Sequence, residues 1–261
     1  MVISPLWLQG AILTFVAGFA VMIYLAVNIY QDRPPIPGRV VDPAGRVIFT
    51  RDDISSGQSV FEQYQLMEYG TLFGHGAYLG PDFTAEYLHT EAELMAGMYG
   101  TDGAAQDGLA PVARVAAELH QNRYDPTTDT LTFTAGQVAA FDALRDFYTA
   151  RFNAPSGQTT LPPRFIQDPT ELHHLTAYFS WATWVTTADR PGNPYSYTAN
   201  WPPELLAGNL PTGDSVVWSV LSIIAILGGT GLVLFFFGRY DWLGWRGADL
   251  EQRRVRFYPP G

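Results

Sequence analysis

The chain has 261 residues, of which 47% are hydrophobic, and a formal net charge of −10. The absence of cysteine excludes disulfides, thiolate metal sites and a haem attached through a CxxCH motif. The acidic balance argues against nucleic acid as a partner, because phosphate contact needs a basic face.

Two stretches are long enough to cross a membrane. Residues 6–30 and 215–238 contain no charged side chain, and a spanning helix needs roughly 20 apolar residues. A cleaved signal peptide is the alternative for the first stretch. That stretch lacks a basic beginning and an obvious cleavage site, so an uncleaved anchor is expected.

Arginine distribution sets the predicted topology. Five arginines follow the second span, and a basic flank indicates the cytoplasmic side. They are Arg239, Arg246, Arg253, Arg254 and Arg256. We therefore expect both termini in the cytoplasm of a bacterial inner membrane and an acidic periplasmic domain. The predicted parts are a cytoplasmic N-terminus (1–5), a first span (6–30), the domain (31–213), a second span (214–238) and a cytoplasmic tail (239–261).

Aromatic residues gather near the ends of the second span. They are Trp218, Tyr240, Trp242 and Trp245. Tryptophan and tyrosine are enriched at membrane interfaces, so an aromatic belt is the preferred interpretation. A quinone-contacting role is the alternative.

The domain begins with a proline-rich connector at 31–39, followed by a hairpin whose turn is the sequence DPAG at 42–45. Capping signals then predict helices that start near Ser55, Thr134 and Asp168. Further helical stretches are expected at 85–99 and 112–122, and a short hairpin at 127–133. Residues 189–213 are predicted to be a loop. The fold class is thus a mainly α membrane protein.

No constellation of side chains predicts a catalytic site or a cofactor site within the chain. The histidines lack zinc-binding spacing, and a structural role is expected for each. They are His75, His89, His120, His173 and His174. The acidic residues Glu86, Glu91 and Glu93 are interpreted as a solvated helix face.

One stretch stands apart, the sequence GHGAYLGPD at 74–82. It is too broken for a helix and too rich in glycine for an ordinary strand. Glycine permits a sharp turn or the close approach of another surface. A turn also exposes carbonyl oxygens, which are ligands for a hard cation such as calcium. The alternative is a packing turn beneath a helix.

The runs FGHGAYLGPDFTAEYLH (73–89) and FSWATWVTTADRPGNPYSYTANWPPE (179–204) resemble the N-terminal region of quinol-dependent nitric oxide reductases. The resemblance implies a periplasmic cytochrome c-like helical domain that lacks haem c and lies between two transmembrane helices. Residues 66–70 (LMEYG) correspond to the CxxCH of haem-bearing relatives. The helix predicted from Ser55 would be the first of this fold, and that from Asp168 the last.

The resemblance also implies a partner and a shared metal. The backbone carbonyls of Gly76 and Tyr78 would help to bind a calcium ion shared with a polytopic, haem-containing catalytic subunit of the haem–copper oxidase type. Haem b and non-haem iron would lie only in that partner, which would take electrons from quinol. His75 is expected to face the partner. The implied role is a non-catalytic subunit in denitrification that anchors and caps the catalytic subunit.

Three alternatives stay open. The chain is expected to be a separate small subunit, but it could be the N-terminal part of a longer polypeptide. The partner could belong to a related NO dismutase-type enzyme. A protein of a different class, a two-span sensor or solute-binding module, would also place an acidic domain outside the membrane.

Overall fold

The computed structural model describes residues 5–101, 110–155 and 160–240. The chain divides into two units, residues 1–210 and 211–261, and each is described by itself. The predicted N-terminus (1–5) lies almost wholly outside the described residues. So does the tail beyond Tyr240, including Trp242, Trp245 and four of the five arginines.

Each unit contains one long apolar helix. Helix α1 spans Pro5–Gln31 and α7 spans Gly213–Tyr240, and both meet the length and composition of a membrane span. Helix α7 carries Asp214 in its first turn and Arg239 in its last. This is the polarity that a helix dipole favours. The prediction of two membrane-length helices around a central domain is confirmed.

A four-stranded sheet lies at one edge of the domain, with strand order β2-β1-β6-β5. Its strands are β1 (Arg39–Val41), β2 (Val47–Thr50), β5 (Tyr124–Asp125) and β6 (Thr130–Thr132). The first hairpin is as predicted, and the Asp42 carboxylate accepts hydrogen bonds from the Ala44 and Arg46 amides. The second hairpin begins earlier than predicted, because Thr127 lies in the turn between β5 and β6.

Helix α2 spans Arg51–Gln63 and corrects one prediction. The N-cap of this helix is Thr50, which forms a reciprocal capping box with Asp53, so the expected start near Ser55 is wrong. Ser55 already lies inside the helix, and Gln58 donates to Glu62 one turn onward instead of reaching back to a cap. Thr-x-x-Asp is also a capping pattern, and it occurs five residues before the Ser-x-x-Gln pattern.

Four further helices complete the domain: α3 (Phe83–Thr101), α4 (Pro111–His120), α5 (Ala135–Phe152) and α6 (Pro169–Thr187). The predicted starts of α5 and α6 are confirmed. Thr134 and Gln137 cap α5 reciprocally. Asp168 accepts a hydrogen bond from the Thr170 amide, and Pro169 occupies the first turn of α6.

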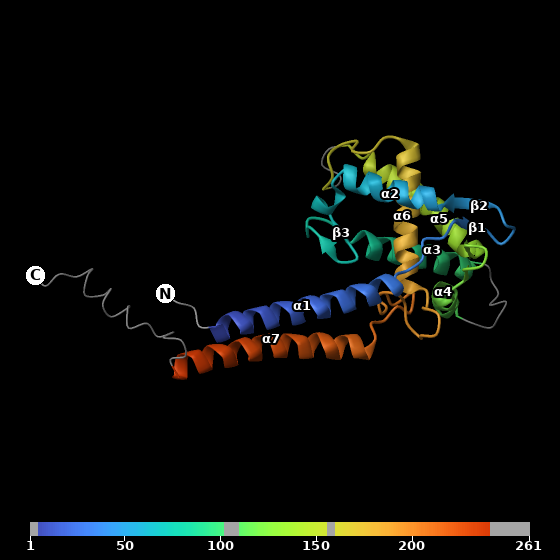
Figure 1. Cartoon of the computed structure of the whole chain (residues 1–261). Coiled ribbons are helices and arrows are strands. Elements are labelled where there is room, and N and C mark those ends of the chain that lie inside the picture. The colour runs from blue at the N-terminus through green and yellow to red at the C-terminus, as the bar shows by residue number, and fades with distance from the viewer. Residues whose placement is uncertain (1–4, 102–109, 156–159, 241–261) are drawn as a thin grey trace, which may run out of the picture. The chain divides into compact units, whose positions relative to one another are not determined.

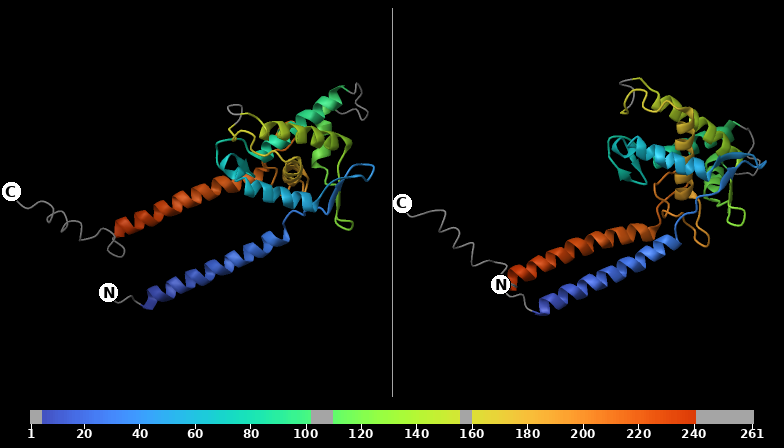
Figure 2. Two further views of the ribbon diagram at one scale, coloured as in Figure 1. Left: turned by 90° about the horizontal axis from the view of Figure 1, so that it is seen from above. Right: turned by 45° about the horizontal axis from the view of Figure 1, so that its top comes forward.

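Helix α6 forms the centre of the domain (Figures 1 and 2). It packs against α2, α3 and α5, and almost every residue from Leu172 to Thr187 is buried. Phe179 stacks on Phe83 with 5.0 Å between ring centroids and meets Phe61 edge-on. A smaller apolar cluster lies between α3 and α4, around Met95 and Leu119. The mainly α fold class is confirmed.

Candidate functional site

The glycine-rich stretch contains a very short hairpin. Strand β3 (Thr71–Leu72) pairs antiparallel with β4 (His75–Gly76), and only Phe73 and Gly74 connect them. Both connecting residues have positive φ, at 51° and 78°. Two positive φ values in a two-residue loop are the signature of a type I′ turn, which matches the natural twist of paired strands.

The glycines allow backbone to touch backbone. A Cβ on Gly76 would lie 2.3 Å from the carbonyl oxygen of Gly70, and its φ is 140°. A Cβ on Gly80 would lie 2.1 Å from the carbonyl oxygen of Tyr69. The Ala77 amide donates to the Met67 carbonyl at 2.7 Å. The surface that approaches these two glycines is therefore the chain's own short helix η1 (Leu66–Glu68) and the residues that follow it.

Asp82 fixes the hairpin to helix α3. Its carboxylate accepts hydrogen bonds from the Thr71 hydroxyl at 2.7 Å, the Gly74 amide at 2.6 Å and the Ala85 amide at 2.9 Å. One side chain thus caps the helix and closes the turn. Sequence reasoning missed this residue, although an aspartate three residues before a helical alanine is an N-cap signal.

The loop after the hairpin presents its side chains outward. Tyr78 is 91% exposed and Leu79 is 70% exposed, and His75 and Gly76 are exposed beside them. Among the described residues, no hydrogen bond reaches the carbonyl oxygen of Tyr78. The structure therefore brings the three predicted site residues, His75, Gly76 and Tyr78, into one exposed segment.

Within the described ranges, no three or more His, Asp or Glu side chains form a group that could hold a metal ion. The histidines outside the hairpin mostly pair with acids of other elements. His89 contacts Glu204 at 3.0 Å, His120 contacts Asp189 at 3.2 Å and His174 contacts Asp53 at 3.3 Å. These contacts tie helices to the loop after α6 or to α2.

With this geometry in place, residues 37–203 match the family model of the NorB cytochrome c-like domain of nitric oxide reductase. The match covers well over half of the chain. The chain belongs to this family. No curated protein sequence gives a significant match. The matched range runs from the connector before β1 to the loop after α6, so both membrane-length helices flank the cytochrome c-like domain.

This cytochrome c-like domain carries no covalent haem c, because the chain has no cysteine. At the positions that the resemblance assigns to the haem motif, Leu66 is fully buried in the main core. Tyr69 packs edge-on against Phe165 with 5.2 Å between ring centroids. Apolar and aromatic side chains of the chain itself occupy this part of the domain.

The interpretation of three glutamates as a solvated face is wrong for two of them. Glu86 forms an ion pair with Arg151, and its side chain is only 19% exposed. Glu91 is 3% exposed, and burial raises the pKa of its carboxyl to about 8. Only Glu93 is well exposed. The reason is tertiary, since α3 packs against α4, α5 and α6 and so buries more than one face.

Proposed function

We propose that the chain is a non-catalytic part of a quinol-type nitric oxide reductase, which anchors and caps a haem-bearing catalytic subunit. The observation that carries this proposal is the family match over residues 37–203 between two membrane-length helices in a chain without cysteine. The complex would convert two NO, two electrons and two protons into nitrous oxide and water. Without a covalent haem, the domain lacks the group through which a cytochrome c passes electrons.

The exposed hairpin segment is the proposed contact with the partner. Tyr78 and Leu79 are apolar side chains that are open to solvent. Covering them with a partner would remove apolar surface from water and so stabilise the complex. They lie beside a backbone held rigid by Asp82 and by the glycine contacts with η1. His75 lies in the same segment and is proposed to face the partner.

The proposed calcium site draws only on backbone oxygen atoms of this chain. Calcium takes six to eight oxygen ligands, and the carbonyls of Gly76 and Tyr78 would supply two of them. Asp82 is the nearest carboxylate in the sequence, but three hydrogen bonds already engage it. The remaining ligands would therefore come from the partner, where the haem b groups and non-haem iron are also proposed to lie.

The proposed placement follows the arginine distribution: a bacterial inner membrane, with the domain in the periplasm and both ends of the chain in the cytoplasm. Residues 1–5 and 239–261 would be the cytoplasmic segments. The two helices would then hold the domain against the periplasmic face of the catalytic subunit, where quinol from the bilayer supplies electrons to the partner.

Purification from native membranes without denaturation tests the proposal. We expect a larger polytopic protein with b-type haem to copurify with this chain, together with NO reduction driven by quinol. After separation under mild denaturation, the Soret absorbance should follow the larger protein. A haem spectrum from this chain alone, or copurification with a receptor or transporter only, would contradict the proposal.

A further inference from the structure

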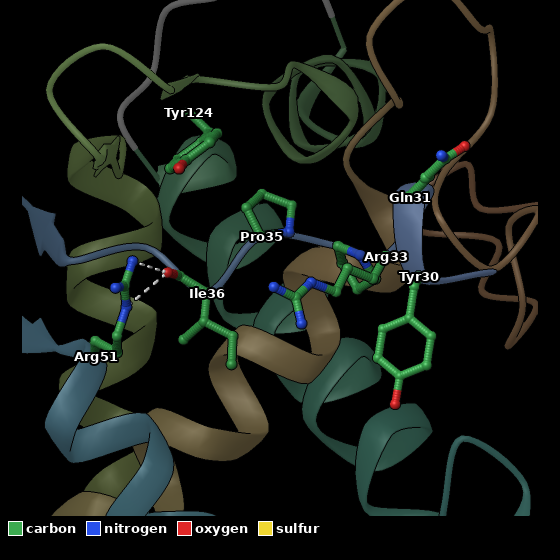
Figure 3. A pocket seen from close by; sticks show the side chains of 8 residues that line it. Tyr30, Gln31, Arg33, Pro35, Ile36, Arg51 and Tyr124 are labelled. Atoms are coloured by element: carbon green, nitrogen blue, oxygen red, sulfur yellow. Dashed lines mark hydrogen bonds between the residues drawn. The ribbon is translucent and has the colours of Figure 1, made fainter. Parts of the chain in front are cut away.

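A pocket of about 500 Å³ lies where α1 ends and the domain begins. Its wall is made of the last residues of α1, the proline-rich connector, and one side chain each from α2 and β5 (Figure 3). The lining residues are Tyr30, Gln31, Arg33, Pro34, Pro35, Ile36, Arg51 and Tyr124. No acidic residue is among them.

The position of the pocket along the chain places it at the membrane surface. Its first two lining residues, Tyr30 and Gln31, are the last residues of the membrane-length helix. The headgroup layer of a bilayer is about 5–8 Å thick on each side of the hydrocarbon core. The connector residues 33–36 follow immediately, so their side chains lie at the depth of lipid headgroups.

The charged side chains that line the pocket, Arg33 and Arg51, are hydrogen-bond donors. Arg33 is exposed, and no described residue accepts a hydrogen bond or forms an ion pair with its guanidinium. The neighbouring acid, Asp32, contacts Arg190 at 3.3 Å instead. Tyr30, which is also exposed, lines the pocket as well. A planar guanidinium matches the oxygen atoms of a phosphate and binds them in a bidentate manner.

The opposite wall is already rigid. Arg51 donates from Nε and Nη2 to the Ile36 carbonyl at 3.0 Å and 2.7 Å, and Nη2 also reaches Asp129 at 2.6 Å. The Tyr124 hydroxyl donates to the other carboxylate oxygen of Asp129 at 2.9 Å. Trp181 donates from Nε1 to the Pro35 carbonyl at 3.0 Å and so fixes the connector to α6. Arg51 is therefore held at a fixed position with its charge paired to Asp129, whereas no described residue engages the guanidinium of Arg33.

We propose that this pocket binds the phosphodiester headgroup of an anionic phospholipid, with Arg33 as the ligand of the phosphate and Arg51 holding the connector in place through the Ile36 carbonyl. The apolar surface of Pro34, Pro35 and Ile36 would contact the glycerol backbone. The acyl chains would remain in the bilayer beside the exposed apolar residues of α1, such as Ile29. A bound lipid would thus brace the junction between the membrane helix and the domain.

Native mass spectrometry of the full chain in detergent tests this site. Phosphatidylglycerol is titrated against the natural chain, Arg33→Gln, Arg33→Lys and the control Arg145→Gln. Arg145 is a partly exposed arginine on α5 whose described ion pairs are with acids of its own helix, Asp142 and Asp146. We expect Arg33→Gln to weaken phosphatidylglycerol binding by about tenfold, Arg33→Lys to weaken it less, and Arg145→Gln to leave it unchanged.

Two further arms identify the source of the phosphate. Phosphatidylcholine carries the same phosphodiester beside a choline cation, so it should bind more weakly and depend less on Arg33. Inorganic phosphate at millimolar concentration should not displace phosphatidylglycerol. Equal phosphatidylglycerol binding by Arg33→Gln and the natural chain would overturn the proposal. So would Arg33-dependent binding of phosphatidylcholine at the same strength, or displacement by inorganic phosphate, which would indicate a site for the free ion.

Discussion

Helix α6 and the segment 70–82 belong to the same domain, and they place their side chains in opposite ways. In α6, side chains on nearly every face are buried, and backbone polar groups are satisfied within the helix. In the segment 70–82, backbone packs on backbone through glycines, and side chains such as Tyr78 project into solvent. The contrast separates two tasks: α6 holds the fold together, and the hairpin segment presents a rigid surface.

A close contact between α2 and α6 gives the largest expected effect. A Cβ on Gly57 of α2 would lie 2.0 Å from the carbonyl oxygen of His174 on α6. Gly57→Val should force the two helices apart and destabilise the domain by about 5 kcal/mol, enough to unfold a typical domain. Thermal unfolding followed by circular dichroism measures the change. Gly100→Ala on α3 serves as the control, because a Cβ added at Gly100 would have no neighbour within 4 Å among the described residues beyond its own turn of the helix.

A Gly57→Val chain that unfolded at the same temperature as the natural chain would show that α2 and α6 are not closely packed. The assignment of α6 as the central element would then fail. The effect of Gly100→Ala should instead be small and, if anything, stabilising, since alanine favours a helix more than glycine does.

Glu91 makes the stability of the core depend on pH. Its carboxyl has an ordinary pKa of 4.5 and a folded-state pKa of about 8. Below pH 4.5 the carboxyl binds its proton in both the folded and the unfolded state, and between pH 4.5 and about 8 only the folded state retains it. Stability therefore falls as pH rises from about 4.5 to 8. Glu91→Gln should remove this dependence and add on the order of 3 kcal/mol at pH 8.

Chemical unfolding at several pH values between 4 and 9 measures this linkage. The informative quantity is the difference between Glu91→Gln and the natural chain, because other carboxyls and the histidines titrate alike in both. Glu93→Gln is the matched control, since Glu93 is exposed on the same helix. Parallel pH profiles for the natural chain and Glu91→Gln would show that Glu91 is solvated.

Asp82 links the two regions, and its removal should have an intermediate effect. Asp82→Ala removes the cap of α3 and the acceptor for the Gly74 amide. Loss of a helix cap costs about 1 kcal/mol, and the unpaired turn amide adds to it, so we expect a loss of about 2 kcal/mol. Hydrogen exchange should accelerate at Gly74 and in the first turn of α3. Asp142→Ala, an exposed acid on α5, should change neither.

Local signals in the sequence predicted the elements whose ends are determined locally. Thr134 and Asp168 cap helices through groups two or three residues away, so their patterns can be read directly. The start of α2 is harder to predict, because the capping pattern at Thr50 is followed five residues later by a second one at Ser55 that is not used as a cap. The parallel pairing of β1 with β6 joins residues about ninety positions apart, and no local pattern encodes it.

The candidate site was also predicted only in part, because some of its features are encoded locally and others depend on long-range packing. The glycines at 74–80 indicated close approach, and the structure shows that the approaching surface at Gly76 and Gly80 is η1 and the residues after it in the same chain. Asp82 and the pocket beside Arg33 depend on which elements meet in space. The burial of Glu91 likewise follows from the helices around α3, which the spacing of acids along the sequence does not reveal.

The smallest effect on stability should come from the residues proposed to matter most for assembly. Tyr78 is almost fully exposed and Leu79 is largely exposed. The free energy of unfolding of the double variant Tyr78→Ala, Leu79→Ser should therefore lie within about 0.5 kcal/mol of that of the natural chain. Recovery of the haem-bearing partner on purification should nevertheless fall several-fold, because the proposed contact loses apolar area. Val47→Ser alters an exposed apolar residue on β2 and should leave recovery unchanged.

The double variant at Tyr78 and Leu79 tests the interface more cleanly than a substitution at Gly76, whose Cβ would meet the Gly70 carbonyl and disturb the hairpin itself. Unchanged recovery of the partner with the double variant would place the partner contact elsewhere on the domain. Reduced recovery with unchanged stability would show that the hairpin segment binds the partner without contributing to the stability of the fold.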